Sequence, residues 1–124
     1  MRKSILSILI LLFLFACDEK QPKEKVTEGK KESVTEYYPS GIKKVEGKMV
    51  NGKRTGKWIY YYENGFIWSE GVFKDGVRNG YSMVYHENGK FKTQGNYRDN
   101  KKVGKWKFWS STGDLVKTVD FDKE

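Results

Sequence analysis

A pattern of glycines and aromatic residues that recurs every 24 residues constrains the fold of this chain more than any other feature. Three glycine series keep that spacing: Gly41, Gly65, Gly89 and Gly113; Gly47, Gly71 and Gly95; and Gly56, Gly80 and Gly104. Aromatic residues follow the same interval in the series Tyr37, Tyr61, Tyr85 and Trp109. We divide the repeat into copies near 37–60, 61–84, 85–108 and 109–121. The pattern predicts one small structural unit that is built several times.

Each copy predicts two β-strands that form a hairpin. In the second copy, segments 57–62 and 66–73 are rich in aromatic and β-branched residues and are bounded by turn signals. The first turn ends in glycine in every copy, which favours a three-residue turn whose last residue is left-handed. Such a turn pairs Tyr62 with Phe66. A second connection, residues 74–80, contains two further turn signals and leads to the next hairpin.

The pairing of Tyr62 with Phe66 also predicts which side chains form the core, because successive residues of a strand point to opposite faces. Odd-numbered residues then lie opposite odd-numbered residues. The predicted core face of the second copy carries Ile59, Tyr61, Ile67, Gly71 and Phe73. Joined hairpins of this kind predict an all-β fold, an elongated antiparallel β-meander of about eight strands in which each unit packs only against its neighbours.

The unit GKWIYYYENGFIWSEGVFKDGVRNG resembles the MORN repeat, in the short bacterial variant found in YwqK-type antitoxin-like proteins. The shared pattern is G-x-W-x-x-Y…N-G…G…DG…G, and the resemblance covers residues 34–121. It implies an open, twisted β-sheet with a binding or scaffolding role and no established reaction. The sequence departs from the pattern where Ser82 stands at the position of Trp58 and Trp106, and where Asn100 replaces a glycine.

Two alternative functions follow from resemblance. Hairpins with tryptophan, tyrosine and glycine turns are also similar to choline-binding cell-wall repeats, whose aromatic cages hold quaternary ammonium groups. Those repeats are shorter and place the glycine differently, so a glycan or cell-wall binding module is an alternative. An antitoxin or immunity-like function is another, although a lipid-anchored protein would not meet a cytoplasmic toxin.

Residues 1–16 predict a lipoprotein signal peptide. A positively charged start is followed by an apolar run over residues 5–15, which is shorter than the roughly 20 residues of a membrane-spanning helix. The segment LFAC at 14–17 resembles the lipobox of bacterial lipoproteins, with a bulkier Phe15 than is usual. The resemblance implies that Cys17, the only cysteine, is lipidated and anchors the exported protein in a membrane of the cell envelope. The alternative is ordinary secretion with a free thiol.

The lipidated cysteine and a flexible charged tether are predicted over residues 17–33. Ten of the 16 residues from 18 to 33 are charged and none is aromatic, so this segment cannot bury enough apolar surface to offset its ordering entropy. The folded domain is therefore predicted over residues 34–124, held near a lipid surface. We expect the outer membrane or the cell surface, and the choice of leaflet stays open.

Two surfaces of the predicted domain are candidate binding sites. If odd-numbered residues form the core, the even-numbered face of the second copy exposes a contiguous aromatic patch, and such patches mark interfaces. The patch consists of Trp58, Tyr60, Tyr62, Phe66 and Trp68. The domain also carries 17 basic and 11 acidic side chains, and part of the basic excess gathers on the second connections. This candidate basic edge consists of Lys53, Arg54, Arg78, Lys101, Lys102 and Lys105.

Catalysis is not predicted. His86 is the only histidine, and it occupies the repeat position of Tyr38 and Tyr62, where a ring substitute is expected. No nucleophile accompanies it in the pattern. One histidine and one lipidated cysteine do not make a metal site, so we predict no metal and no cofactor.

The predicted function is therefore binding or scaffolding in the cell envelope by a lipid-anchored β-repeat surface. A protein of the envelope is the expected partner, ahead of a glycan or an anionic lipid headgroup. Export argues against a nucleic-acid partner. Open sheet edges are a common route to dimers, so pairing of two copies is an alternative.

Overall fold

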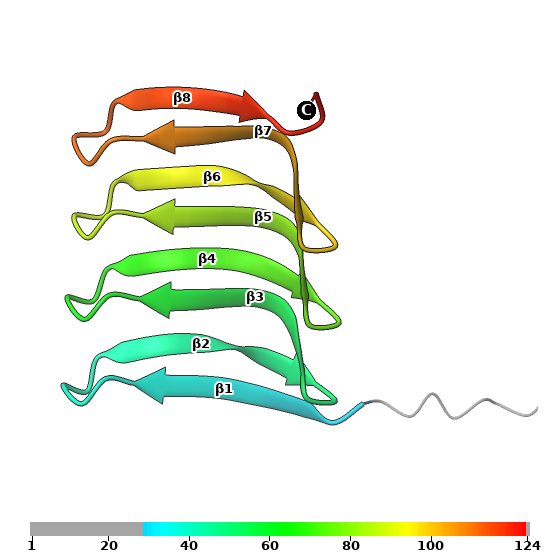
Figure 1. Cartoon of the computed structure of the whole chain (residues 1–124). Helices are drawn as coiled ribbons and strands as arrows, with labels where there is room; N and C mark the ends of the chain where they lie inside the picture. Colours follow the sequence, from blue (N-terminus) through cyan, green and yellow to red (C-terminus); the bar gives the residue numbers. More distant parts are fainter. Residues whose placement is uncertain (1–28, 124) are drawn as a thin grey trace, which may run out of the picture.

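The computed structural model describes residues 29–123, which form one open sheet of eight antiparallel strands in chain order (Figure 1). The strands are β1 (Lys31–Tyr37), β2 (Lys43–Val50), β3 (Lys53–Tyr61), β4 (Ile67–Lys74), β5 (Val77–Tyr85), β6 (Phe91–Arg98), β7 (Lys101–Trp109) and β8 (Leu115–Asp120). Each strand pairs only with its neighbours in sequence, so the predicted all-β meander of repeated hairpins is confirmed. β1 and β8 are the two open edges.

The turns at one border of the sheet follow the predicted three-residue form. In the hairpin β3–β4 the amide of Tyr62 donates to the carbonyl of Phe66 at 2.8 Å, and the amide of Gly65 donates to the carbonyl of Tyr62 at 3.0 Å. Gly65 has φ 91°, a left-handed value that glycine adopts without steric cost. The equivalent glycines occupy the equivalent turns of the other hairpins along this border (Figure 1): Gly41, Gly89 and Gly113.

The turns at the opposite border are shorter than predicted. Lys74 pairs with Val77, so only Asp75 and Gly76 lie between them, with φ 49° and 84°. Positive φ at both central residues is the signature of a type I′ turn, which suits the right-handed twist of the paired strands. The predicted connection 74–80 was therefore too long, because residues from Val77 onward already belong to β5.

The predicted odd-to-odd register was wrong, because each hairpin contains a β-bulge next to its three-residue turn. Tyr61 pairs with Ile67, but Tyr60 already pairs with Ser69, which leaves Trp68 as an extra residue of β4. One extra residue reverses the faces of every residue that follows it. Trp58 consequently lies opposite Gly71, and the predicted core face of the second copy is split between the two sides of the sheet.

The two faces of the sheet carry different side chains. We call the side that bears Trp58, Ser82 and Trp106 the tryptophan face, and the side that bears Tyr61 and Tyr85 the tyrosine face. Among the residues that the structure describes, the buried hydrophobic side chains are Val45, Trp58 and Trp106, with 6, 3 and 3% exposure. Ser82 is the buried polar side chain, at 8%. The tryptophan face is therefore where this single-layer sheet has its core.

The sheet begins at Lys31, three residues before the predicted domain boundary at residue 34. The predicted signal peptide and Cys17 lie outside the described residues, as does the predicted tether up to residue 28. From residue 29 to residue 123, no helix is long and apolar enough to cross a membrane.

Candidate functional site

The tryptophan face is built on glycines that lie beneath indole rings. A Cβ atom added to Gly47 would come within 2.2 Å of Trp58 Cδ2, and one added to Gly95 within 2.1 Å of Trp106 Cδ2. Each indole therefore lies flat against backbone that only glycine leaves clear. Each ring also has a polar partner, because Nε1 of Trp58 donates to the carbonyl of Lys48 at 3.1 Å. Nε1 of Trp106 donates to the carbonyl of Asn96 at 3.2 Å.

A second row of rings stands beside the tryptophans at the same spacing. Trp106 meets Tyr97 edge to face with centroids 5.0 Å apart, and meets Phe121 in the same way at 6.2 Å. Trp58 meets Phe73 at 6.3 Å with an interplanar angle of 69°. Edge-to-face pairs of this kind are worth about 0.5–1.5 kcal/mol beyond their buried area. The rings thus form two interlocked groups along the sheet, one of Trp58 with Phe73 and one of Trp106 with Tyr97 and Phe121.

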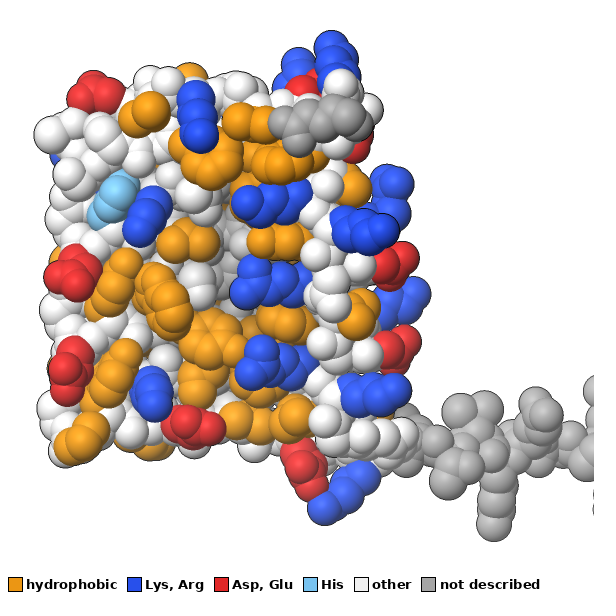
Figure 2. Space-filling view, viewed as in Figure 1, with side chains coloured by type: hydrophobic (Ala, Val, Ile, Leu, Met, Phe, Trp, Pro, Cys, Tyr) orange, Lys and Arg blue, Asp and Glu red, His pale blue; other side chains and the backbone are white. Residues whose placement is uncertain are grey.

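Basic side chains cover these rings in a third row, again one repeat apart. The Arg54 guanidinium lies 4.8 Å from the Trp58 ring centroid, and Lys102 Nζ lies 4.9 Å from that of Trp106. These are cation–π contacts, in which the positive charge faces the electron-rich ring. Figure 2 shows basic side chains aligned across the face next to hydrophobic ones. Arg78 is the third basic residue of this row. It differs from Arg54 and Lys102 because the residue four positions after it is Ser82 and not a tryptophan.

The substitution at Ser82 leaves a hollow in the tryptophan face. The cavity has a volume of about 350 Å³, and its lining includes Gly71, Phe73, Ser82 and Tyr97. A Cβ atom added to Gly71 would meet nothing closer than the Tyr81 carbonyl oxygen at 3.3 Å, whereas its counterparts Gly47 and Gly95 are covered by indoles. Arg78, with no tryptophan beneath it, lies over Tyr97 at 5.1 Å and donates to its hydroxyl at 3.2 Å.

The predicted aromatic patch is only partly exposed. Phe66 and Trp68 are 53% and 45% exposed, whereas Trp58 is buried at 3% and cannot belong to an exposed patch. Tyr60 and Tyr62 are half-buried and lie against Trp68, with centroids 6.0 and 6.3 Å away. Trp68 and Tyr60 also line the hollow, so the exposed ring of Trp68 borders the cavity, whereas Phe66 is not part of its lining. Whether these residues bind a partner stays a prediction.

The six residues of the predicted basic edge do not form one edge. Arg54, Arg78 and Lys102 lie over the rings of the tryptophan face. Lys53 and Lys101 are their exposed neighbours in sequence and, by strand alternation, point to the other side. Lys105 is exposed on β7, opposite Asp120 of β8.

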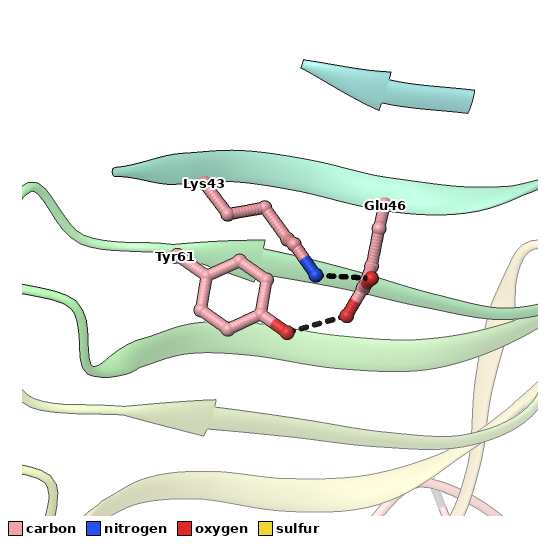
Figure 3. A network of polar contacts seen from close by, with 3 residues as sticks. All are labelled: Lys43, Glu46 and Tyr61. Carbon is pink, nitrogen blue, oxygen red and sulfur yellow. Dashed lines mark hydrogen bonds and ion pairs between the residues drawn. The ribbon is translucent and has the colours of Figure 1, made fainter. Parts of the chain in front are cut away.

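The tyrosine face carries a polar network at Tyr61, and farther along the sheet a group of aromatic rings in which Phe91 lies 5.4 Å from Tyr85 and 5.6 Å from Trp109 between centroids. The hydroxyl of Tyr61 donates to Glu46 Oε1 at 2.5 Å, and Lys43 Nζ lies 2.7 Å from Glu46 Oε2 (Figure 3). Burial, followed by the hydrogen bond to Glu46, raises the pKa of Tyr61 to about 12. The hydrogen bond from Lys43, and then that from Tyr61, lowers the pKa of the Glu46 carboxyl.

His86 has a structural contact that its repeat position explains. The hydroxyls of Tyr38 and Tyr62 donate to the carbonyls of Tyr61 and Tyr85, which lie one unit further along the chain. His86 Nε2 lies 3.0 Å from the carbonyl of Trp109, so it must carry a proton to take the same role. His86 therefore makes the contact expected of a residue that stands in for tyrosine at this repeat position. No cluster of three or more metal-ligating side chains exists among residues 29–123.

The hollow was not predicted, although its signal was in the sequence. Ser82 stands out against Trp58 and Trp106 once the copies are aligned. What could not be seen is that all three positions lie on the core side of the sheet. That depends on the bulge at Trp68, which no residue type specifies.

Comparison with known proteins agrees with the repeat. Residues 54–75 and 78–99 each match the family described as MORN repeat variant. The two matches lie over the β3–β4 and β5–β6 hairpins and support a MORN-repeat protein. No curated protein matches the chain significantly. The antitoxin-like assignment and the lipoprotein signal stay predictions.

Proposed function

We propose that this chain, whose central hairpins match the MORN repeat variant, is a lipid-anchored envelope protein that binds another protein through the central part of its sheet. One observation carries the proposal. The second unit exposes Phe66 and Trp68, whereas the next unit has Lys90 and Lys92 at the equivalent positions. Two exposed aromatic rings in one unit do not help to keep a sheet soluble, and aromatic side chains are enriched at protein interfaces.

The surroundings of these rings suit a protein partner. Trp68 stands at the mouth of the hollow, together with the half-buried Tyr60. Arg54 lies beside them, 5.9 Å from the Tyr60 ring centroid. Tryptophan, tyrosine and arginine are the residue types that contribute most to binding energy at protein interfaces. The site therefore combines an exposed apolar centre with a charged neighbour.

Site-specific photocrosslinking tests the binding surface. A photoreactive phenylalanine analogue replaces Phe66 in the full chain, expressed in its native host, and Leu115 serves as the control position because it is almost equally exposed, at 55% against 53%. We expect a discrete heterologous crosslink from position 66 that disappears with the additional Trp68→Ser substitution. Equal crosslinking from both positions, or none from position 66, would contradict the proposal. A crosslink only between two copies would favour self-association.

The lipid anchor rests on the sequence alone. Cys17 follows the apolar run and ends the segment LFAC, which resembles a lipobox. We expect Cys17→Ser to prevent incorporation of a clickable fatty acid and to release the protein from the membrane fraction. Adding Ser33→Cys to that variant, which places the only thiol in strand β1, is the matched control and should not restore labelling. Labelling that persists in Cys17→Ser would contradict the anchor.

A further inference from the structure

We propose that the hollow over Gly71 binds the tryptophan side chain of a protein partner, whose indole takes the place that Trp58 and Trp106 fill in the neighbouring units. The inference rests on the proposed function and specifies the chemistry of the partner. Its starting point is that the repeat shows three versions of one site. Two are filled by the chain's own indole, and the third has the same surroundings with a serine at the position of the ring.

The floor of the hollow matches the floor of the filled sites. Gly71 has the repeat position of Gly47 and Gly95, each of which lies in contact with an indole. Ser82 is 8% exposed and pairs directly with Gly71, so neither side chain rises to fill the space. A flat ring therefore has an uncovered glycine to lie on, beside a Gly80 whose φ is 129° where Gly56 and Gly104 have 64°. The volume of about 350 Å³ is at the small end of the roughly 300–1,000 Å³ of ligand sites.

The walls of the hollow are also equivalent. Trp106 lies between Tyr97 and Phe121, edge to face with both. One unit earlier the flanking rings are Phe73 and Tyr97, and both line the hollow. An indole in the hollow would thus meet two ring edges in the arrangement that Trp106 already shows. The aromatic surroundings favour a planar ring over an aliphatic side chain.

Two polar features favour indole over other rings. Trp58 and Trp106 donate their Nε1–H groups to the carbonyls of Lys48 and Asn96, and Val72 has the same repeat position midway between these two. Its carbonyl is the equivalent acceptor for the N–H of an incoming indole. Arg78 provides the cation, because Arg54 and Lys102 lie over the tryptophan four residues further on.

The positive charge of the tryptophan face indicates which residues should flank the partner's tryptophan. Arg54, Arg78 and Lys102 form a row along the tryptophan face, and the whole chain has a net charge of +8. A tryptophan flanked by carboxylates complements this row, because opposite charges accelerate encounter and fix orientation. The expected partner is therefore a protein with an exposed tryptophan in an acidic segment.

The test uses the full chain in detergent micelles and a capped peptide, Asp-Asp-Trp-Asp-Asp, titrated by nuclear magnetic resonance. We expect saturable shifts of the amide signals of Gly71, Val72 and Ser82. Replacing the peptide's tryptophan with 1-methyltryptophan removes only the N–H and should weaken binding about fivefold, the effect of one hydrogen bond. Replacement with leucine should weaken it at least about thirtyfold. A leucine peptide or free indole that binds as tightly as the tryptophan peptide would overturn the inference.

A second test fills the hollow with a side chain of the protein itself and compares peptide binding with that of the parent protein. Ser82→Trp should restore the pattern of the neighbouring units, raise the melting temperature and abolish peptide binding. Ser111→Trp adds an indole at an exposed turn and should leave binding unchanged. If Ser82→Trp does not fold, Ser82→Leu occupies part of the same space and should weaken binding about tenfold. Unchanged binding in a folded Ser82 variant would overturn the inference.

The same variant separates this inference from the proposed function. The crosslink expected from position 66 should be lost when Ser82→Trp is added to the chain. If that crosslink persists in the Ser82→Trp protein, the chain binds a partner at its central unit but not through the hollow. The proposed function then stands and the tryptophan-binding inference fails. If the crosslink is absent from the parent protein as well, the proposed function itself fails.

Discussion

The positions of Trp58 and Ser82 are equivalent in the repeat and differ in the side chain that fills them. At Trp58 an indole covers Gly47, donates a hydrogen bond and lies beneath a cation. One unit later Ser82 leaves Gly71 uncovered, and the order of the strands is kept, but the register shift moves from between Glu46 and Lys48 to between Gly71 and Phe73. The order of the strands therefore does not depend on the indole, whereas the local pairing differs where the indole is absent. A repeat protein can leave one unit open because filled units stand on both sides of it.

Removing an indole from a filled site should have the largest effect. We expect Trp58→Ala and Trp106→Ala each to lower the free energy of unfolding by about 3–5 kcal/mol, because both the buried ring and its edge-to-face contacts are lost. Urea denaturation followed by far-ultraviolet circular dichroism measures the change. Ser82→Ala is the matched control and should change stability by less than about 1 kcal/mol. A similar loss in all three variants would show that the hollow is not open in solution.

Adding one methyl group to the floor of each site sharpens the comparison. Gly47→Ala and Gly95→Ala place a Cβ atom within 2.2 and 2.1 Å of an indole, so the ring must move. We expect each to cost about 1–3 kcal/mol, the usual range for overpacking. Gly71→Ala places its Cβ atom 3.3 Å from the Tyr81 carbonyl oxygen and 3.9 Å from Ser82 Cα, much less crowded than an indole contact, and should stay within about 1 kcal/mol of the parent protein.

Thermal melts of the three glycine variants decide this prediction, since all three remove a glycine from the same place in a strand. The change in backbone entropy is therefore common to them, and differences report the space above each glycine. Equal destabilisation by Gly71→Ala and Gly95→Ala would mean that the floor of the hollow is covered.

The repeat explains why so much of the fold was predictable. Gly41, Gly65, Gly89 and Gly113 require positive φ at the end of a turn, and this requirement is local enough to be visible in the sequence. The number of strands and their order follow from the spacing. The side of the sheet on which each side chain lies did not follow from the spacing, because one bulge residue per hairpin reverses the alternation. A bulge is a backbone feature that Trp68, Lys44 and Lys92 share without sharing any side-chain property.

The candidate site was predictable only in part for the same reason. Phe66 and Trp68 were expected to be exposed and are, since they differ from the lysines of the next unit. Trp58 was placed with them because the register was inferred from the turn alone. Tyr97 and Arg78 were not recognised as surroundings of a cavity, because the cavity exists only when the copies are stacked.

Tyr62 and His86 make equivalent contacts between units at the turn border, and their substitution should have a smaller effect on stability. Each ring reaches a carbonyl one unit further on, at 2.8 Å for Tyr62 and 3.0 Å for His86. We expect Tyr62→Phe and His86→Phe each to lose about 0.5–1.5 kcal/mol, the net value of one hydrogen bond. His86→Tyr restores the hydroxyl of the other units and should keep the parent's stability. Denaturant midpoints of the four proteins provide the measurement.

The two faces of the sheet should also differ in how their contribution to stability depends on pH, because the tyrosine face carries the polar network of Tyr61 and Glu46. The pKa of Tyr61 is raised to about 12, against an ordinary value near 10. Because the folded state favours the neutral phenol, the stability from Tyr61 is present below pH 10 and is lost as pH rises toward 12. Tyr61 is part-exposed, which screens the effect, so we expect a loss of only about 0.5 kcal/mol.

Tyr61→Phe removes this ionisation, so its free energy of unfolding should fall less than that of the parent protein between pH 10 and 12. Subtracting the two curves cancels the lysines and the other tyrosines, which titrate in the same range in both proteins. Burial is the larger cause of the raised pKa, so Glu46→Gln should keep most of the difference. Trp58 and Trp106 carry no titrating group, and the tryptophan face should contribute nothing to this difference. Identical curves for the parent and Tyr61→Phe would show that the Tyr61 hydroxyl faces water, and that the tyrosine face has no ordered polar network.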